Sequence, residues 1–74
     1  MNLDNLKYQS ETNDITFRYQ EKEYVICLLK GKYFCGEAGN DEDDNIFDSF
    51  EDMADNWIIQ GNKLKDIVKN IEVI

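Results

Sequence analysis

A period-two pattern of large apolar side chains in residues 15–19 and 24–28 limits the fold of this chain more than any other feature. Apolar residues alternate with polar ones over residues 15–19, and large apolar residues again occupy every second position over residues 24–28, with the smaller Val25 and Cys27 between them. A period of two is typical of β-strands that bury one face. We place a two-residue turn at Glu21-Lys22, which predicts a hairpin with one apolar face. In this register six large apolar side chains would form three cross-strand pairs: Tyr19 with Tyr24, Phe17 with Ile26, and Ile15 with Leu28.

The sequence extends this hairpin into a meander. A turn at Lys30-Gly31, where glycine tolerates a positive φ, returns the chain through residues 33–35. Residues 6–10 are interpreted as an additional first strand. Residues 36–45 contain one alanine as their sole apolar side chain and predict an exposed loop. We therefore expect an antiparallel sheet of three or four strands.

Helical periodicity begins after this loop. The large side chains recur every three or four residues, which is typical of one face of a helix. Ser49 followed by Asp52 resembles a capping box, a pattern that marks a helix N-terminus. The apolar face of this first helix is expected to comprise Phe47, Phe50, Ala54 and Trp57, with Met53 beside it.

Gly61 is expected to end the first helix, and Asn62 is a candidate N-cap for a second one. The second helix has an apolar stripe of Leu64, Ile67, Val68 and Ile71. Residues 71–74 are expected to close onto the sheet as a short strand. The chain thus predicts one α+β domain over residues 1–74, a β-meander followed by two short helices packed on one sheet face. The predicted core comprises Phe17, Ile26, Leu28, Phe50, Trp57, Leu64, Ile67 and Val68.

The residue types that the chain lacks exclude several kinds of chemistry. It contains no histidine, so Ser-His-Asp and Cys-His catalysis are excluded. Two cysteines without histidine cannot supply the four ligands of a structural zinc site. No glycine-rich phosphate-binding loop is present. We expect neither an enzyme nor a bound cofactor or metal.

The two cysteines, Cys27 and Cys35, are expected to be reduced. With a turn at Lys30-Gly31 they point to opposite faces of the sheet, whereas a three-residue turn would place them opposite each other. Residues 1–14 are polar and hold no apolar signal-peptide region, and no apolar run approaches the about 20 residues of a membrane span. These features predict a cytoplasmic protein that does not bind membranes.

Acidic residues are concentrated in one part of the chain. The net charge is −8, from 16 acidic and 8 basic residues. Between Lys32 and Lys63 there is no lysine or arginine. The candidate protein-binding residues are the nine acids of this stretch: Glu37, Asp41, Glu42, Asp43, Asp44, Asp48, Glu51, Asp52 and Asp55.

Two interpretations of this acidic stretch remain open. An anionic loop and helix would attract a basic protein and repel nucleic acid. Alternatively, the charge serves only to keep a small domain soluble. The aromatic residues Tyr8, Tyr24, Tyr33 and Phe34 are candidates for a base-stacking platform, but the net charge argues against direct nucleic-acid binding.

Part of the acidic stretch resembles a calcium-binding EF-hand loop. Asp41, Asp43 and Asn45 match its first three ligand positions, and Asp52 falls at the twelfth. However, Ile46 stands where the loop requires glycine, and Asp52 replaces the bidentate glutamate. We therefore do not predict a calcium site.

In size, acidity and β-then-α order the chain resembles the small inhibitors of phages and mobile elements, including anti-CRISPR and anti-restriction proteins. The resemblance is one of composition and transfers no site residues. It implies a nucleic-acid mimic that blocks the basic nucleic-acid-binding site of a bacterial host protein. An immunity protein against a basic toxin nuclease is the first alternative. The second alternative is a small structural subunit or a homodimer that buries one sheet face.

Overall fold

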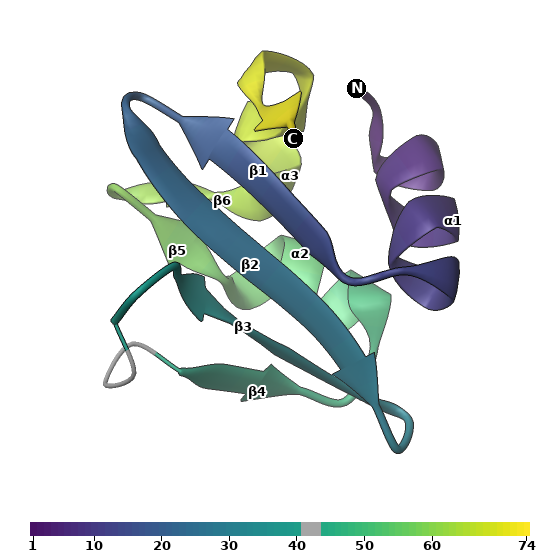
Figure 1. Ribbon diagram of the computed structural model, residues 1–74. Coiled ribbons are helices and arrows are strands. Elements are labelled where there is room, and N and C mark those ends of the chain that lie inside the picture. The colour runs from purple at the N-terminus through teal and green to yellow at the C-terminus, as the bar shows by residue number, and fades with distance from the viewer. Residues whose placement is uncertain (41–43) are drawn as a thin grey trace.

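An antiparallel sheet forms the framework of the computed structural model, which describes residues 1–40 and 44–74 (Figure 1). Within these residues the sheet has five strands in the order β4-β3-β2-β1-β7. The predicted α+β class and the antiparallel meander are confirmed. The strands are β1 (Ile15–Tyr19), β2 (Lys22–Leu29), β3 (Lys32–Glu37), β4 (Asn45–Phe47) and β7 (Glu72–Val73).

The first hairpin forms as expected, but its predicted register was wrong by two residues. The turn lies at Gln20-Glu21, and β1 pairs with β2 through Tyr19 with Lys22, Phe17 with Tyr24 and Ile15 with Ile26. Both turn residues have positive φ, 48° and 69°. These values are typical of the two-residue hairpin turn whose twist matches that of the flanking strands. Because the shift is an even number of residues, the same side chains still face the core.

The second turn and the positions of the two cysteines match the predictions from the sequence. Lys30 and Gly31 form the predicted turn, so Leu29 pairs with Lys32. Cys27 then lies opposite Phe34, whereas Cys35 lies opposite Ile26 on the other face of the sheet. The two cysteines are not joined by a disulfide.

The N-terminal segment corrects a second prediction. Residues 6–10, interpreted as a strand, belong to the helix α1 (Leu3–Thr12). The Asn2 side chain caps this helix by accepting a hydrogen bond of 2.8 Å from the Asn5 backbone N–H. Leu6 and Ser10 are buried beneath the helix. The periodicity is weak because one of the inward positions holds a serine instead of an apolar residue.

Strand β4 corrects the prediction that residues 36–45 form a loop. Gly36 and Glu37 complete β3, and Asn45 begins β4. Phe47, which we assigned to the first helix, belongs to β4 and pairs with Tyr33. Residues 41–43 lie outside the described part of the chain. The tail forms β7 at the opposite edge, which confirms the expected C-terminal strand.

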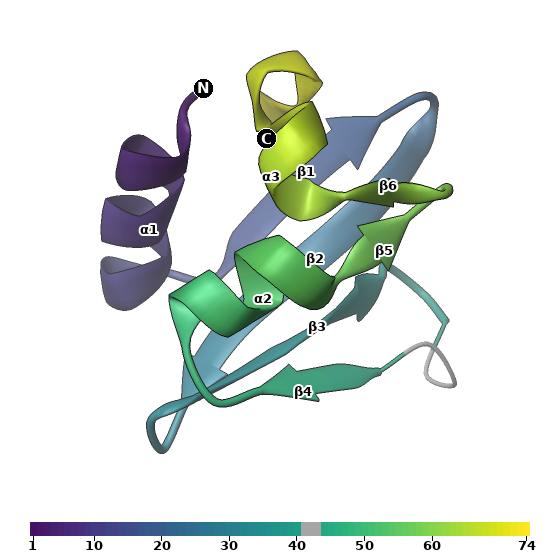
Figure 2. The ribbon, with the colours of Figure 1, turned by 180° about the vertical axis from the view of Figure 1, so that it is seen from behind.

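Two helices follow on one face of the sheet. Figure 2 shows α2 (Phe50–Asn56) and α3 (Leu64–Ile67) lying across the strands, with α1 at one side. Ser49 caps α2 as predicted, because its hydroxyl accepts a hydrogen bond of 3.0 Å from the Asp52 N–H. Asn62 is not an N-cap. It belongs to a small hairpin of β5 (Ile58–Ile59) and β6 (Asn62–Lys63), and a 3₁₀ helix, η1 (Val68–Asn70), continues α3.

The core lies between the sheet and these helices. Of the predicted core residues, Leu28 is half-buried because it lies beyond the end of β1, and the others are buried. Trp57 makes edge-to-face contacts with Phe17 at 5.9 Å and Tyr24 at 6.1 Å between ring centroids. Among the described residues, no helix combines the length and apolar character needed to cross a bilayer. The buried hydrophobic residues are Leu6, Ile15, Phe17, Tyr19, Tyr24, Ile26, Tyr33, Cys35, Phe50, Met53, Ala54, Trp57, Ile59, Leu64, Ile67, Val68 and Ile71.

Candidate protein-binding site

The exposed acids around α2 are held in place by the local fold. Ser49 starts the helix, and the packing of Phe50 and Met53 against the core fixes which side faces water. Glu51 and Asp55 therefore lie on the exposed side of α2, one helical turn apart. Asp44 and Asp48 are exposed at either end of β4. We call these four residues, Asp44, Asp48, Glu51 and Asp55, the acidic surface.

Three residues of the acidic surface form ion pairs with lysines from other elements. Lys7 of α1 lies 3.0 Å from Glu51. Lys32 of β3 lies 3.2 Å from Asp48, and Lys65 of α3 lies 3.3 Å from Asp55. The acids that are isolated from bases along the sequence therefore meet bases in space.

Both side chains of each of these ion pairs are accessible to solvent. Glu51 has 66% of its side chain accessible to solvent and Asp48 has 82%. Exposed pairs of this kind contribute about 0–1 kcal/mol and are screened by salt. A partner that brings its own cations can therefore replace the lysines at little cost, and the net charge of −8 is unchanged by the pairing.

The other predicted site residues lie elsewhere. Glu37 is half-buried at the end of β3, opposite Tyr24. Asp52 is half-buried and accepts a hydrogen bond of 2.6 Å from the Asn56 side chain, so it serves the helix itself. Asp41, Glu42 and Asp43 lie outside the described residues. Two of them, Asp41 and Asp43, are ligand positions of the EF-hand pattern. In the rest of the chain no three acids or cysteines are grouped as a metal site would require.

A groove between α1 and α2 adjoins the acidic surface and was missed at the sequence level. It has a volume of about 240 Å³ and an apolar floor of Leu3, Phe50 and Ala54. Its rim carries four charged residues: Asp4, Lys7, Glu51 and Asp55. The groove depends on α1 being a helix, which explains why the strand interpretation of residues 6–10 concealed it.

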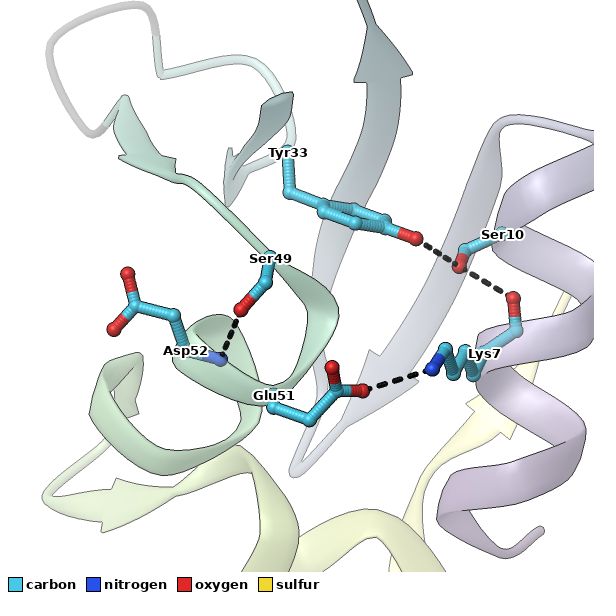
Figure 3. Close-up of polar contacts among 6 residues, drawn as sticks. All are labelled: Lys7, Ser10, Tyr33, Ser49, Glu51 and Asp52. Atoms are coloured by element: carbon cyan, nitrogen blue, oxygen red, sulfur yellow. Dashed lines mark hydrogen bonds and ion pairs between the residues drawn. The ribbon is translucent and has the colours of Figure 1, made fainter. Parts of the chain in front are cut away.

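Lys7 spans this groove. In Figure 3 its side chain extends from α1 towards Glu51 on α2, while the Ser10 hydroxyl, one turn further along α1, meets the Tyr33 hydroxyl. The hydrogen bond to Glu51 and the charge of that carboxylate raise the pKa of Lys7, with a further contribution from Glu11. The Glu51 carboxylate thus stabilises the charged form of Lys7.

The other face of the sheet is a second candidate surface, and Figure 1 shows that no helix of residues 1–40 and 44–74 covers it. Val25, Leu29 and Ile46 are 37%, 54% and 57% exposed on this face. Cys27 and Phe34 lie among them as half-buried cross-strand neighbours. We call these five residues, Val25, Cys27, Leu29, Phe34 and Ile46, the open sheet face.

Two ion pairs flank the open sheet face. Arg18 lies 3.5 Å from Glu23, and the pair of Lys32 with Asp48 lies at the other end. The four aromatic residues considered for base stacking do not gather here, because Tyr24 and Tyr33 are buried in the core. An apolar centre with a polar rim is the usual anatomy of a protein interface.

Comparisons of the chain with protein-family models, curated proteins and solved structures found no match. The fold and its surfaces are therefore the basis for any functional proposal.

Proposed function

We propose that this protein is a non-enzymatic cytoplasmic domain that binds a basic protein through the acidic surface. In its most specific form the proposal is an inhibitor of the phage or mobile-element type, which occupies the basic nucleic-acid-binding site of a bacterial host protein. The observation that carries it is the exposure of Asp44, Asp48, Glu51 and Asp55 on one β4–α2 segment that has no base of its own.

The physical basis is long-range attraction followed by local exchange of ion pairs. A surplus of exposed carboxylates speeds encounter with a cationic groove and disfavours nucleic acid. This attraction extends about 8–10 Å at physiological ionic strength. On contact, Lys7, Lys32 and Lys65 can release their carboxylates to the partner's cations because the existing pairs are solvent-exposed.

A capture experiment with matched baits tests this proposal. The protein and a variant carrying Asp48→Asn, Glu51→Gln, Asp52→Asn and Asp55→Asn are immobilised and exposed to bacterial lysate at low and high salt. The wild-type bait should retain a basic nucleic-acid-binding protein that salt releases and that the variant fails to retain. Equal retention of the same proteins by both baits would contradict the proposal.

An immunity protein against a basic toxin nuclease shares this physical basis. The two forms differ in the captured partner, because the nuclease would lose its enzymatic activity in the complex. A purified captured protein is therefore assayed both for nucleic-acid binding and for nuclease activity, with and without the domain.

The open sheet face supports a second candidate function, a structural subunit that pairs with another copy of itself. Two ion pairs, Arg18 with Glu23 and Lys32 with Asp48, flank its apolar centre. The Asp14 carboxylate also lies beside Cys27 on this face, so a second copy would have to leave that carboxylate at a solvated rim. Sedimentation at increasing salt tests this: a dimer that persists in salt and is lost on Ile46→Lys favours it, whereas a monomer at all concentrations contradicts it.

A further inference from the structure

The α1–α2 groove carries an imbalance of charge over an apolar floor. Asp4, Glu51 and Asp55 contribute three carboxylates to its rim, and Lys7 contributes one ammonium. Lys65, which does not line the groove, pairs with Asp55 at 3.3 Å, so the three carboxylates meet two ammonium groups. The floor of Leu3, Phe50 and Ala54 would contact methylene groups favourably. A ligand that complements this groove has an aliphatic stem and a cationic end.

The size of the groove limits what it can hold. Its volume of about 240 Å³ is below the roughly 300–1,000 Å³ of typical small-molecule sites. One long side chain fits such a space better than a cofactor or a folded peptide. Arginine and lysine are the side chains that combine an aliphatic stem with a positive charge.

The chain already places one of its own cations at this position. Lys7 reaches from α1 to Glu51 at 3.0 Å, although 45% of its side chain remains exposed. An arriving cation would compete with Lys7 for the same carboxylate. Because Lys7 is half-exposed, its ammonium can turn to water when a ligand arrives.

We propose that the α1–α2 groove is a subsite that receives one arginine or lysine side chain of the basic partner. The stem lies over Leu3, Phe50 and Ala54, and the cationic end lies among Asp4, Glu51 and Asp55. Lys7 and Lys65, which pair with Glu51 and Asp55, are the resident competitors of the incoming cation. This inference rests on the proposed function, because it assumes a basic protein partner.

The direct probe is a short acetylated and amidated peptide that carries one arginine between glycines. Its control is the same peptide with citrulline, which is neutral but nearly the same shape. In NMR titrations of the ¹⁵N-labelled protein, the arginine peptide should shift the backbone amides of Asp4, Lys7, Ala54 and Asp55. The citrulline peptide should shift them far less. Equal shifts with both peptides would overturn the proposal.

Two variants with matched controls test the roles of the rim residues. Asp4→Asn should weaken binding of the arginine peptide about two- to fivefold, whereas Asp66→Asn, an exposed aspartate on α3, should not. Lys7→Met should strengthen binding by a similar factor because it removes one competitor, whereas Lys69→Met should leave it unchanged. Unchanged affinity in both Asp4→Asn and Lys7→Met would overturn the proposal. The fold of each variant is verified from the dispersion of its NMR spectrum.

The outcomes separate this inference from the proposed function. If the arginine peptide shifts the amides of Asp44 and Asp48 but not those of the groove, the subsite is refuted while binding of a basic partner stands. If the fourfold-neutralised variant binds the captured partner as tightly as the wild type, the proposed function fails whatever the peptide shows.

Discussion

Lys7 Nζ lies 3.0 Å from Glu51 Oε2, so an ion pair joins α1 to α2 across the groove between them. Together with the pairs of Lys32 with Asp48 and Lys65 with Asp55, it brings bases to a stretch that has none in sequence. The acidic surface is therefore a set of exchangeable ion pairs with an anionic surplus. It differs in this respect from a field of mutually repelling carboxylates.

Trp57 is expected to be the side chain whose loss the fold tolerates least. It is 2% exposed and contacts the rings of Phe17 and Tyr24. Truncation to alanine should cost about 3–5 kcal/mol of unfolding free energy, which is most of the stability of a domain this small. Circular dichroism during thermal unfolding measures the effect. Trp57→Phe is the control and should remain folded, and an unchanged melting temperature for Trp57→Ala would refute the described packing.

The first hairpin turn is expected to be a site of backbone strain. Glu21 has a φ of 69°, whereas the corresponding positions of the other two-residue turns are Gly31 and Gly61. Left-handed backbone is costly for a residue with a Cβ atom, so Glu21→Gly should stabilise the protein by about 0.5–1 kcal/mol. Urea unfolding measures this change. Glu23→Gly in β2 is the matched control and should destabilise, so a loss of stability in both variants would contradict the turn geometry.

Cys27 is expected to react slowly with alkylating reagents near neutral pH. A hydrogen bond to Asp14, burial and the charge of that carboxylate together raise the pKa of Cys27. The thiolate is the reactive form, so its formation requires a higher pH than for an ordinary cysteine. Asp14→Asn should lower the pKa and accelerate alkylation at pH 7–8, as followed by mass spectrometry over a pH series.

The matched control for this experiment is Glu11→Gln, which removes a charge from α1 without touching the Cys27 thiol. It should leave the alkylation profile of Cys27 unchanged. A profile that is the same for the wild type and for Asp14→Asn would show that the carboxylate does not govern this thiol.

The sequence predicted the faces of the sheet well and the details of its pairing less well. Alternation assigns Ile15, Phe17 and Ile26 to the core whatever the turn, because a two-residue slip preserves the face. The register depended on the turn, and Gln20-Glu21 lacks the glycine or asparagine that usually signals two positive φ values. Lys30-Gly31 has that glycine, and its turn was predicted correctly.

Sequence patterns point only to the acids of the candidate site, because the lysines that meet these acids come from contacts distant in sequence. The periodicity of α1 is obscured at Ser10, whose buried hydroxyl donates to the Lys7 carbonyl oxygen at 2.8 Å and lies 3.5 Å from the Tyr33 hydroxyl. Without α1 as a helix, neither the groove nor the lysine partner of Glu51 can be anticipated. Local patterns are sufficient to locate the acids, but tertiary packing decides which bases reach them.

Stability should change little when the acids around α2 are neutralised together. Mutual repulsion alone would predict a gain for Asp48→Asn, Glu51→Gln, Asp52→Asn and Asp55→Asn. Three of these residues, however, have lysine partners, and Asp52 bonds to Asn56. We expect the combined variant to stay within about 1 kcal/mol of the wild type, since each exposed pair contributes little. Urea unfolding checks this, and a larger loss would mean that these pairs hold the fold.

The sharpest test of binding through the acidic surface is a calorimetric titration of this fourfold variant against the captured basic partner at two salt concentrations. Its control neutralises four acids outside the acidic surface: Asp14, Glu21, Asp66 and Glu72. Binding by the variant should be at least tenfold weaker, which is about 1.4 kcal/mol over four charges. The salt dependence of binding should also be reduced in the variant, and the control should show a small effect. Unchanged affinity with unchanged salt dependence would contradict binding through the acidic surface and leave solubility as the role of the charge.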